Sequence, residues 1–68
     1  MRLHLQRRLD KRWHSMGTLT LDDIDVVCRH SDSLARKIGV REMRMTRQDG
    51  DFQVVATWDY NLGWKVSP

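Results

Sequence analysis

Hydrophobic and polar residues alternate on both sides of Asp49-Gly50, from Arg41 to Asp59. A period of two is typical of β-strands, and Asp-Gly favours the tight type I′ turn because both of its central residues need positive φ. We therefore predict a β-hairpin over residues 41–59. Its register would place Met45 opposite Val54, Met43 opposite Ala56 and Arg41 opposite Trp58. One face would then carry Met43, Met45, Phe52, Val54, Ala56 and Trp58, and the other Glu42, Arg44, Thr46, Gln53, Val55 and Thr57.

The middle of the chain has a helical period and predicts an amphipathic helix over residues 20–39. Thr20 is a suitable N-cap with Asp23 three residues on, and Gly39 is a suitable C-terminal stop. The apolar arc of this helix consists of Leu21, Ile24, Val27, Cys28, Leu34, Ala35 and Ile38, with Ser31 as its polar member. The opposite side, with Asp22, Asp25, Arg29, Asp32 and Arg36, is expected to face solvent.

The first sixteen residues predict a second, basic helix or arm. Leu5, Leu9, Trp13 and Met16 fall on one helical stripe, and most basic residues lie away from it. Residues 60–68 form a turn and tail, in which residues 64–66 either make a short third strand or fold over the core. The expected fold class is α+β, a single small domain over residues 1–68 with a basic N-terminal helix, a long amphipathic helix and an antiparallel hairpin.

Length and cysteine content limit the kind of protein that this chain forms. With 68 residues, one core barely outweighs conformational entropy, so we expect a marginally stable monomer or a dimer. The one cysteine, Cys28, cannot form an internal disulfide. Together with the lack of a visible signal peptide, this favours a reducing, cytoplasmic compartment. No apolar run approaches the roughly 20 residues that span a bilayer, so we expect no membrane partner.

Net charge alternates along the chain and suggests nucleic acid as a partner. It is +4 over residues 1–14, −3 over 15–33, +4 over 34–48 and −2 over 49–68. The basic segments 2–12 and 36–47 could contact phosphates, and a polar hairpin face around Arg44 could contact a backbone or bases. The candidate nucleic-acid-binding residues are Arg7, Arg8, Lys11, Arg12, Arg44 and Arg47. The same pattern also fits internal complementarity, with acidic and basic segments lying side by side.

A protein-binding regulatory or inhibitory role is the alternative function. Methionines beside aromatic residues make an adaptable apolar surface, and one helix does not cover a whole sheet. The remaining apolar surface would be buried by another protein or by a second copy in a homodimer. The candidate interaction residues are Trp13, Met43, Met45 and Trp64.

Residues 33–40, Ser-Leu-Ala-Arg-Lys-Ile-Gly-Val, resemble the first helix and turn of repressor-type helix-turn-helix domains. That resemblance implies DNA binding by a second helix in the major groove. It extends over eight residues only, and the segment that follows Gly39 alternates as a strand where the recognition helix should begin.

Catalytic and metal-binding patterns are not found in the sequence. Cys28-x-His30 matches no common zinc spacing, and on a helix the two side chains point in different directions. Glu42 is the only glutamate, and neither a phosphate-binding glycine loop nor a nucleophile elbow is present. We therefore expect a non-enzymatic protein without cofactor, metal or small-molecule substrate.

Overall fold

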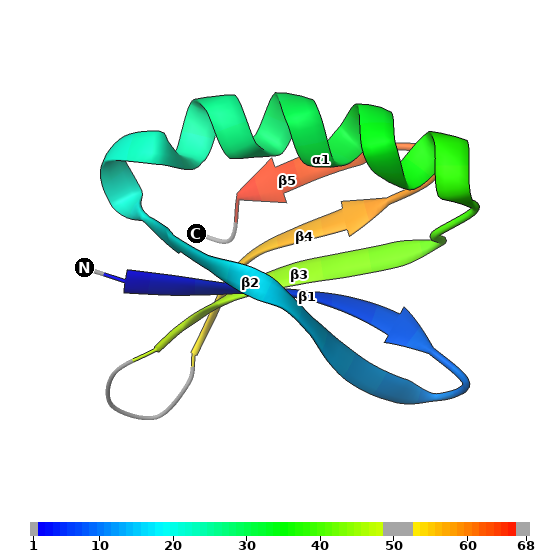
Figure 1. The fold of residues 1–68 in the computed structure, drawn as a ribbon, viewed down its shortest axis with the longest axis horizontal. Helices are drawn as coiled ribbons and strands as arrows, with labels where there is room; N and C mark the ends of the chain where they lie inside the picture. The colour runs from blue at the N-terminus through cyan, green and yellow to red at the C-terminus, as the bar shows by residue number, and fades with distance from the viewer. Residues whose placement is uncertain (1, 49–52, 67–68) are drawn as a thin grey trace.

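The computed structural model describes residues 2–48 and 53–66 and contains an antiparallel sheet with one helix packed on one face (Figure 1). The elements are β1 Arg2–Leu9, β2 Arg12–Thr20, a 3-10 turn Leu21–Asp23, α1 Ile24–Ile38, β3 Glu42–Arg47, β4 Val54–Asp59 and β5 Gly63–Val66. The five strands are ordered β2-β1-β3-β4-β5 across the sheet. In the described part of the chain, no helix has the length and hydropathy needed to cross a membrane.

The predicted architecture of two helices followed by a hairpin is wrong, because residues 2–16, which were expected to be helical, contribute to two strands. Leu3 and Leu5 are buried beneath α1, and they alternate with the more exposed His4 and Gln6. The predicted stripe relied on Leu5 and Leu9, and a spacing of four residues fits a period of two as well as one of 3.6. The turn between β1 and β2 was missed because it contains neither glycine nor asparagine.

The turn itself consists of Asp10 and Lys11, which both have positive φ, 52° and 66°. Positive φ at both central residues is the conformation of a type I′ turn, and it gives Leu9 and Arg12 as cross-strand partners. Farther from this turn, Leu5 of β1 lies opposite Gly17 of β2, and Gln6 lies opposite Ser15. Met16 is therefore an extra residue, a β-bulge in β2. Met16 packs against the core beside α1.

Helix α1 begins later than expected and ends where expected. Its N-cap is Asp23, not Thr20, and the Thr20 hydroxyl instead donates a hydrogen bond to the Asp23 carboxylate at 2.8 Å. Gly39 takes a left-handed conformation with φ 79° and ends the helix. The residues after Gly39 lead into β3, which rules out the recognition helix that the helix-turn-helix resemblance implies.

The helix is rotated relative to the predicted apolar arc. Ser31 and Ala35 are its buried residues, whereas Leu34 and Ile38 are 48% and 52% exposed. Asp32, which was expected to face solvent, turns toward the sheet and accepts a hydrogen bond from it. The buried face of the helix is therefore shifted, relative to the predicted apolar arc, toward the side that carries Asp32. Part of the apolar arc, including Leu34 and Ile38, stays exposed.

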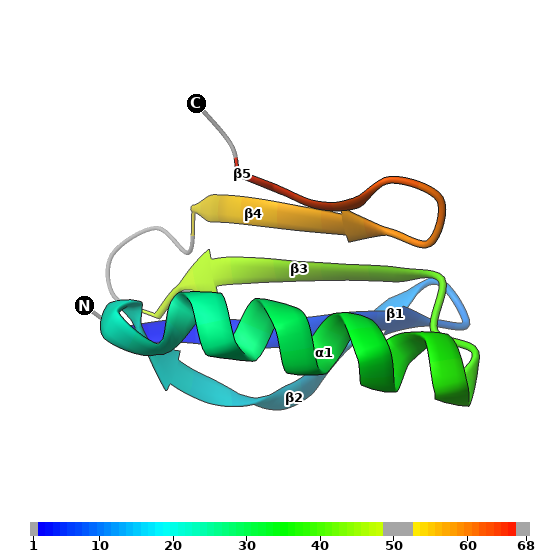
Figure 2. The same ribbon diagram turned by 90° about the horizontal axis from the view of Figure 1, so that it is seen from above.

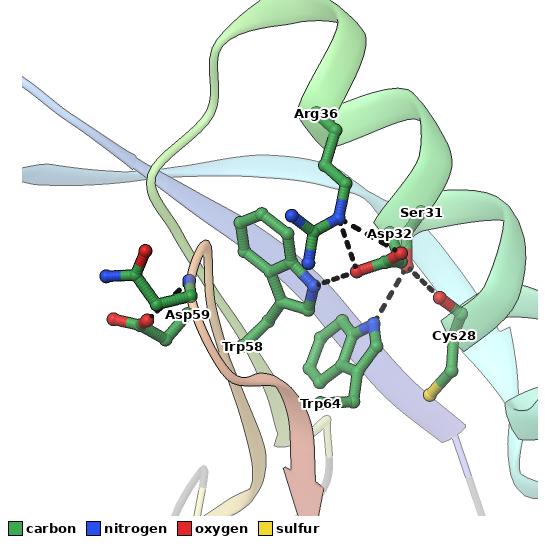
Figure 3. Close-up of polar contacts among 8 residues, drawn as sticks. Cys28, Ser31, Asp32, Arg36, Trp58, Asp59 and Trp64 are labelled. Carbon is green, nitrogen blue, oxygen red and sulfur yellow. Dashed lines mark hydrogen bonds and ion pairs between the residues drawn. The ribbon is translucent and has the colours of Figure 1, made fainter.

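Two tryptophan hydrogen bonds explain this rotation (Figure 3). Trp58 Nε1 on β4 donates to Asp32 Oδ1 at 2.7 Å, and Trp64 Nε1 on β5 donates to Ser31 Oγ at 3.2 Å. Seen from above, β4 and β5 extend beyond the edge of α1 (Figure 2). The two indoles reach from these strands to the helix, and each buried indole N–H needs a partner there.

Arg36 completes this contact, because its Nε lies 3.3 Å from both oxygens of Asp32. Its guanidinium also lies over the rings of Trp58 and Tyr60, 5.5 and 5.0 Å from their centroids. The pKa of Asp32 is lowered, mainly by the Trp58 hydrogen bond and then by the Arg36 hydrogen bond. We call Ser31, Asp32, Arg36, Trp58 and Trp64 the tryptophan clamp.

The register predicted for the β3–β4 hairpin is also wrong. Met45 lies opposite Ala56 and Met43 opposite Trp58, a shift of two residues along β4. The predicted Asp49-Gly50 turn lies outside the described residues. A shift of two keeps each side chain on its face, so Met43, Met45, Ala56 and Trp58 still share the buried side. A bulge at Val55 exchanges the expected faces of Val54 and Val55, and Val55 packs against the core.

We expect Lys11→Gly to leave stability unchanged or raise it by up to about 1 kcal/mol, because glycine adopts positive φ without strain. In a helix the same change would cost about 1 kcal/mol. Urea denaturation measures the difference. The control is Arg12→Gly, which places glycine within β2 and should be destabilising; a destabilised Lys11→Gly variant would contradict the turn.

The clamp predicts a specific acid sensitivity. Because the folded protein lowers the pKa of Asp32, its stabilising contribution is present above the ordinary value of 3.8 and is lost as pH falls through the lowered pKa. In melting curves recorded from about pH 6 down to pH 2.5, Asp32→Asn should lose less stability than the wild type. Asp25→Asn removes an exposed carboxylate from the same helix and serves as the control. Parallel acid profiles for wild type and Asp32→Asn would contradict the role of Asp32.

Candidate nucleic-acid interface

The face of the sheet opposite α1 is not covered by any described element (Figure 1). Successive residues of a strand point to opposite faces, so the neighbours of the buried core residues lie on this side. We call it the uncovered face. Its side chains are Arg2, His4, Gln6 and Arg8 from β1, Trp13, Ser15, Thr18 and Thr20 from β2, Glu42, Arg44 and Thr46 from β3, Val54, Thr57 and Asp59 from β4, and Lys65 from β5.

Trp13 lies beside two arginines near one end of the uncovered face. The Arg44 guanidinium is 4.1 Å from the indole centroid and that of Arg8 is 5.6 Å away. The sheet register explains this arrangement, since Arg8 is the β1 partner of Trp13 and Arg44 is the β3 partner of Gln6. Arg44 Nε donates a 2.7 Å hydrogen bond to Gln6 Oε1, which fixes the guanidinium beside the ring. The half-buried indole is thus held in place by groups from three strands.

Farther along the same face, His4 and Ser15 join β1 to β2. His4 Nε2 and Ser15 Oγ are hydrogen-bonded at 2.6 Å. The β3 partner of His4 is Thr46, which is 3% exposed despite lying on the uncovered side. The hydroxyl, imidazole and amide groups of this region can donate or accept hydrogen bonds to a polar ligand.

Charges of both signs occur on the uncovered face, and Arg44 and Glu42 line the same depression. Cations come from β1, β3 and β5, as Arg2, Arg8, Arg44 and Lys65. The carboxylates of Glu42 and Asp59 belong to a cross-strand pair at the end of β3 and β4. A shallow depression of about 350 Å³ lies between the two regions, and Trp13, Arg44, Thr57, Glu42 and Asp59 contribute to its lining. An anionic group would be attracted to the arginine side and repelled at the carboxylate end.

The six basic residues predicted from the sequence do not form one surface. Arg8 and Arg44 meet at Trp13, whereas Arg7 and Arg47 lie on the side that α1 packs against, opposite Met43 and Leu3. Lys11 is in the β1–β2 turn, and Arg12 is the cross-strand partner of Leu9. The structure therefore brings together two of the six.

The predicted interaction residues are also divided. Met43 and Met45 are 1% and 0% exposed in the core, so they do not form a surface patch. Trp64 is half-buried and belongs to the tryptophan clamp. Trp13 alone of the four lies on the uncovered face. Sequence reasoning missed His4, Gln6 and Lys65, and the alternation from Arg2 to Gln6 is the signal that would have placed the first two there.

Cysteine and histidine do not form a reactive site in the described part of the chain. Cys28 is a half-buried free thiol whose pKa is raised, first by desolvation and second by the charge of Asp25, so its nucleophilic thiolate form is disfavoured. Residues 2–48 and 53–66 contain no group of three or more His, Cys, Asp or Glu side chains that could hold a metal ion.

Comparisons with protein-family models, curated proteins and solved structures found no match to this chain. The function must therefore be argued from the chemistry of its own surfaces. The most distinctive of these is the uncovered face, where an indole and two guanidinium groups are held together on a polar sheet.

Proposed function

We propose that this chain is a small non-enzymatic module that binds single-stranded nucleic acid on its uncovered face. The observation that carries the proposal is the half-buried Trp13 ring beside Arg44 and Arg8, on a sheet face that no described helix covers. Single-stranded nucleic acid presents base faces that stack on aromatic and guanidinium planes, and phosphates that attract cations. The uncovered face offers an indole ring to the bases and guanidinium groups to the phosphates within one small area.

The arrangement of charges suggests a path for the strand. Arg2 and Arg8 stand at the two ends of β1, and both project on the uncovered side. Phosphates would follow β1 and β2 from Arg2 to Arg8, and the Glu42 and Asp59 carboxylates lie near the Arg8 end of this path. A base stacked near Trp13 would bring its exocyclic amino group toward those carboxylates, which accept hydrogen bonds from amino groups. The Glu42 and Asp59 carboxylates would then repel the phosphate backbone of the nucleic acid, and they would also contact the base.

Unpaired bases suit this surface better than a duplex does. An open sheet face with one aromatic ring can receive a splayed base, whereas sequence-specific duplex binding usually inserts a helix or a two-stranded ribbon into a groove. The free thiol of Cys28 is compatible with the reducing, cytoplasmic compartment expected from the sequence.

Fluorescence anisotropy with labelled single-stranded RNA, single-stranded DNA and duplex DNA tests the proposal. We expect the single strands to bind more tightly than the duplex, with a marked loss of affinity as salt rises. Trp13→Ala should weaken binding by about 5- to 100-fold through the loss of stacking. Arg44→Gln should reduce the slope of log affinity against log salt by about 0.7 if Arg44 neutralises one phosphate.

Arg29→Gln provides the matched control, because Arg29 is an exposed arginine on α1, on the other side of the molecule. It should bind as the wild type does. Failure of all three ligands to bind at low salt would refute the proposal. An equal loss of affinity in the Arg44→Gln and Arg29→Gln variants would show that binding depends on net charge and not on the uncovered face.

A further inference from the structure

Helix α1 carries an exposed stripe that the domain itself does not cover. Its residues recur at helical spacing on one side of the helix. They are the N-cap Asp23 and, within α1, Val26, His30, Leu34 and Lys37, all of them exposed. Val26 and Leu34 are 50% and 48% exposed. We call this set the helix stripe.

A recess beside the helix stripe extends the apolar surface. It has a volume of about 320 Å³, and its lining includes Met16 from the β2 bulge, Leu5 from β1, and Val26, Val27 and Leu34 from the helix. This side of α1 lies opposite the tryptophan clamp. The rotation that brings Asp32 to Trp58 is thus the same rotation that exposes Leu34.

The order of residues in the helix stripe is symmetric about His30. Val26 and Leu34 lie four residues on either side of it, and Asp23 and Lys37 lie seven residues on either side. Two such helices in antiparallel orientation, related by a two-fold axis at His30, would align Val26 with Leu34 of the second copy. The same alignment would place Asp23 against Lys37 of the second copy, twice in the pair.

We propose that the helix stripe is a homodimer interface in which two copies of α1 pack antiparallel about His30. The charges favour a second copy over an unrelated partner, because the acidic end of the stripe faces the basic end of the same sequence after the two-fold rotation. Such self-complementary surfaces are the requirement for an isologous interface. The recess beside Leu34 offers space for an apolar side chain of the second copy.

The expected dimer is weak. One pair of four-turn helices buries less area than a standard stable interface of about 1,600 Å², so association should appear only at high protein concentration. The stripe is on the helix and the proposed nucleic-acid site is on the opposite side of the sheet. The dimer proposal is therefore independent of nucleic-acid binding, and either can fail alone.

A charge-exchange experiment on the purified full chain tests the interface. Sedimentation equilibrium, at concentrations up to about 1 mM, should show reversible dimerisation of the wild type. Asp23→Lys and Lys37→Asp should each dimerise at least about tenfold more weakly, because like charges then face each other at both ends. An equimolar mixture of the two variants should recover dimers, since each contact again pairs opposite charges.

Asp25→Lys makes the same charge change in the first turn of α1 but away from the helix stripe, and it should dimerise as the wild type does. Because Asp23 is the N-cap, circular dichroism must show that its variant is folded. If it is not, Val26→Lys and Leu34→Glu form a second pair, again expected to dimerise when mixed. A wild type that stays monomeric over the whole concentration range, or folded variants that do not recover dimers on mixing, would overturn the proposal.

Discussion

The position of α1 depends on the two indole N–H groups that attach it to the far strands of the sheet. One helix must cover an antiparallel sheet of five strands, and its ribbon overlies only part of that width (Figure 2). Trp58 and Trp64 are long enough to span the gap from β4 and β5, and their donors find Asp32 and Ser31 on the helix. An indole buried without such a partner would lose a hydrogen bond that it makes with water. The position of these two acceptors, together with the apolar residues that pack on the core, therefore sets which side of α1 faces the sheet.

Both candidate surfaces follow from this constraint. Turning α1 toward β4 and β5 leaves Val26 and Leu34 exposed on the opposite side, where the proposed dimer contact lies. Covering one face of the sheet with the only described helix also leaves the other face open to solvent. That face is polar because its residues alternate with buried leucines and methionines, and a tryptophan stays half-accessible there because arginines from two strands hold it.

Sequence reasoning reached part of this structure. Gly39 identified the end of the helix correctly, because a left-handed residue after Arg36 and Lys37 is a local signal. The faces of Met43, Met45 and Arg44 were assigned correctly although the hairpin register was wrong by two residues, since an even shift preserves the alternation. The first strand was mistaken for a helix because the Asp10-Lys11 turn has no glycine after the aspartate, and the pairing of β1 with β2 and β3 joins it to segments that a local pattern does not consider.

The candidate site was harder to predict from the sequence than the helix and strands were. Arg8, Trp13 and Arg44 meet only if residues 2–20 form a hairpin and β1 lies beside β3, and this pairing joins segments almost forty residues apart. Likewise, the rotation of α1 depends on Trp58 and Trp64, which come after the helix in the chain. A helical wheel treats the helix as if apolar burial alone oriented it, and here hydrogen bonds from another element act together with the packing of Ile24, Val27 and Ala35.

The bulge at Met16 has a consequence for the free edge of the sheet. β2 is an edge strand of nine residues, long enough to serve as a template for strand addition by another chain. The extra residue and the adjacent Gly17, with φ 135°, interrupt the regular spacing of its outward-facing N–H and C=O groups. The opposite edge, β5, has only four residues and includes Lys65. The irregular backbone that gives Met16 its place beside the helix thus also protects this small sheet against edge-to-edge aggregation.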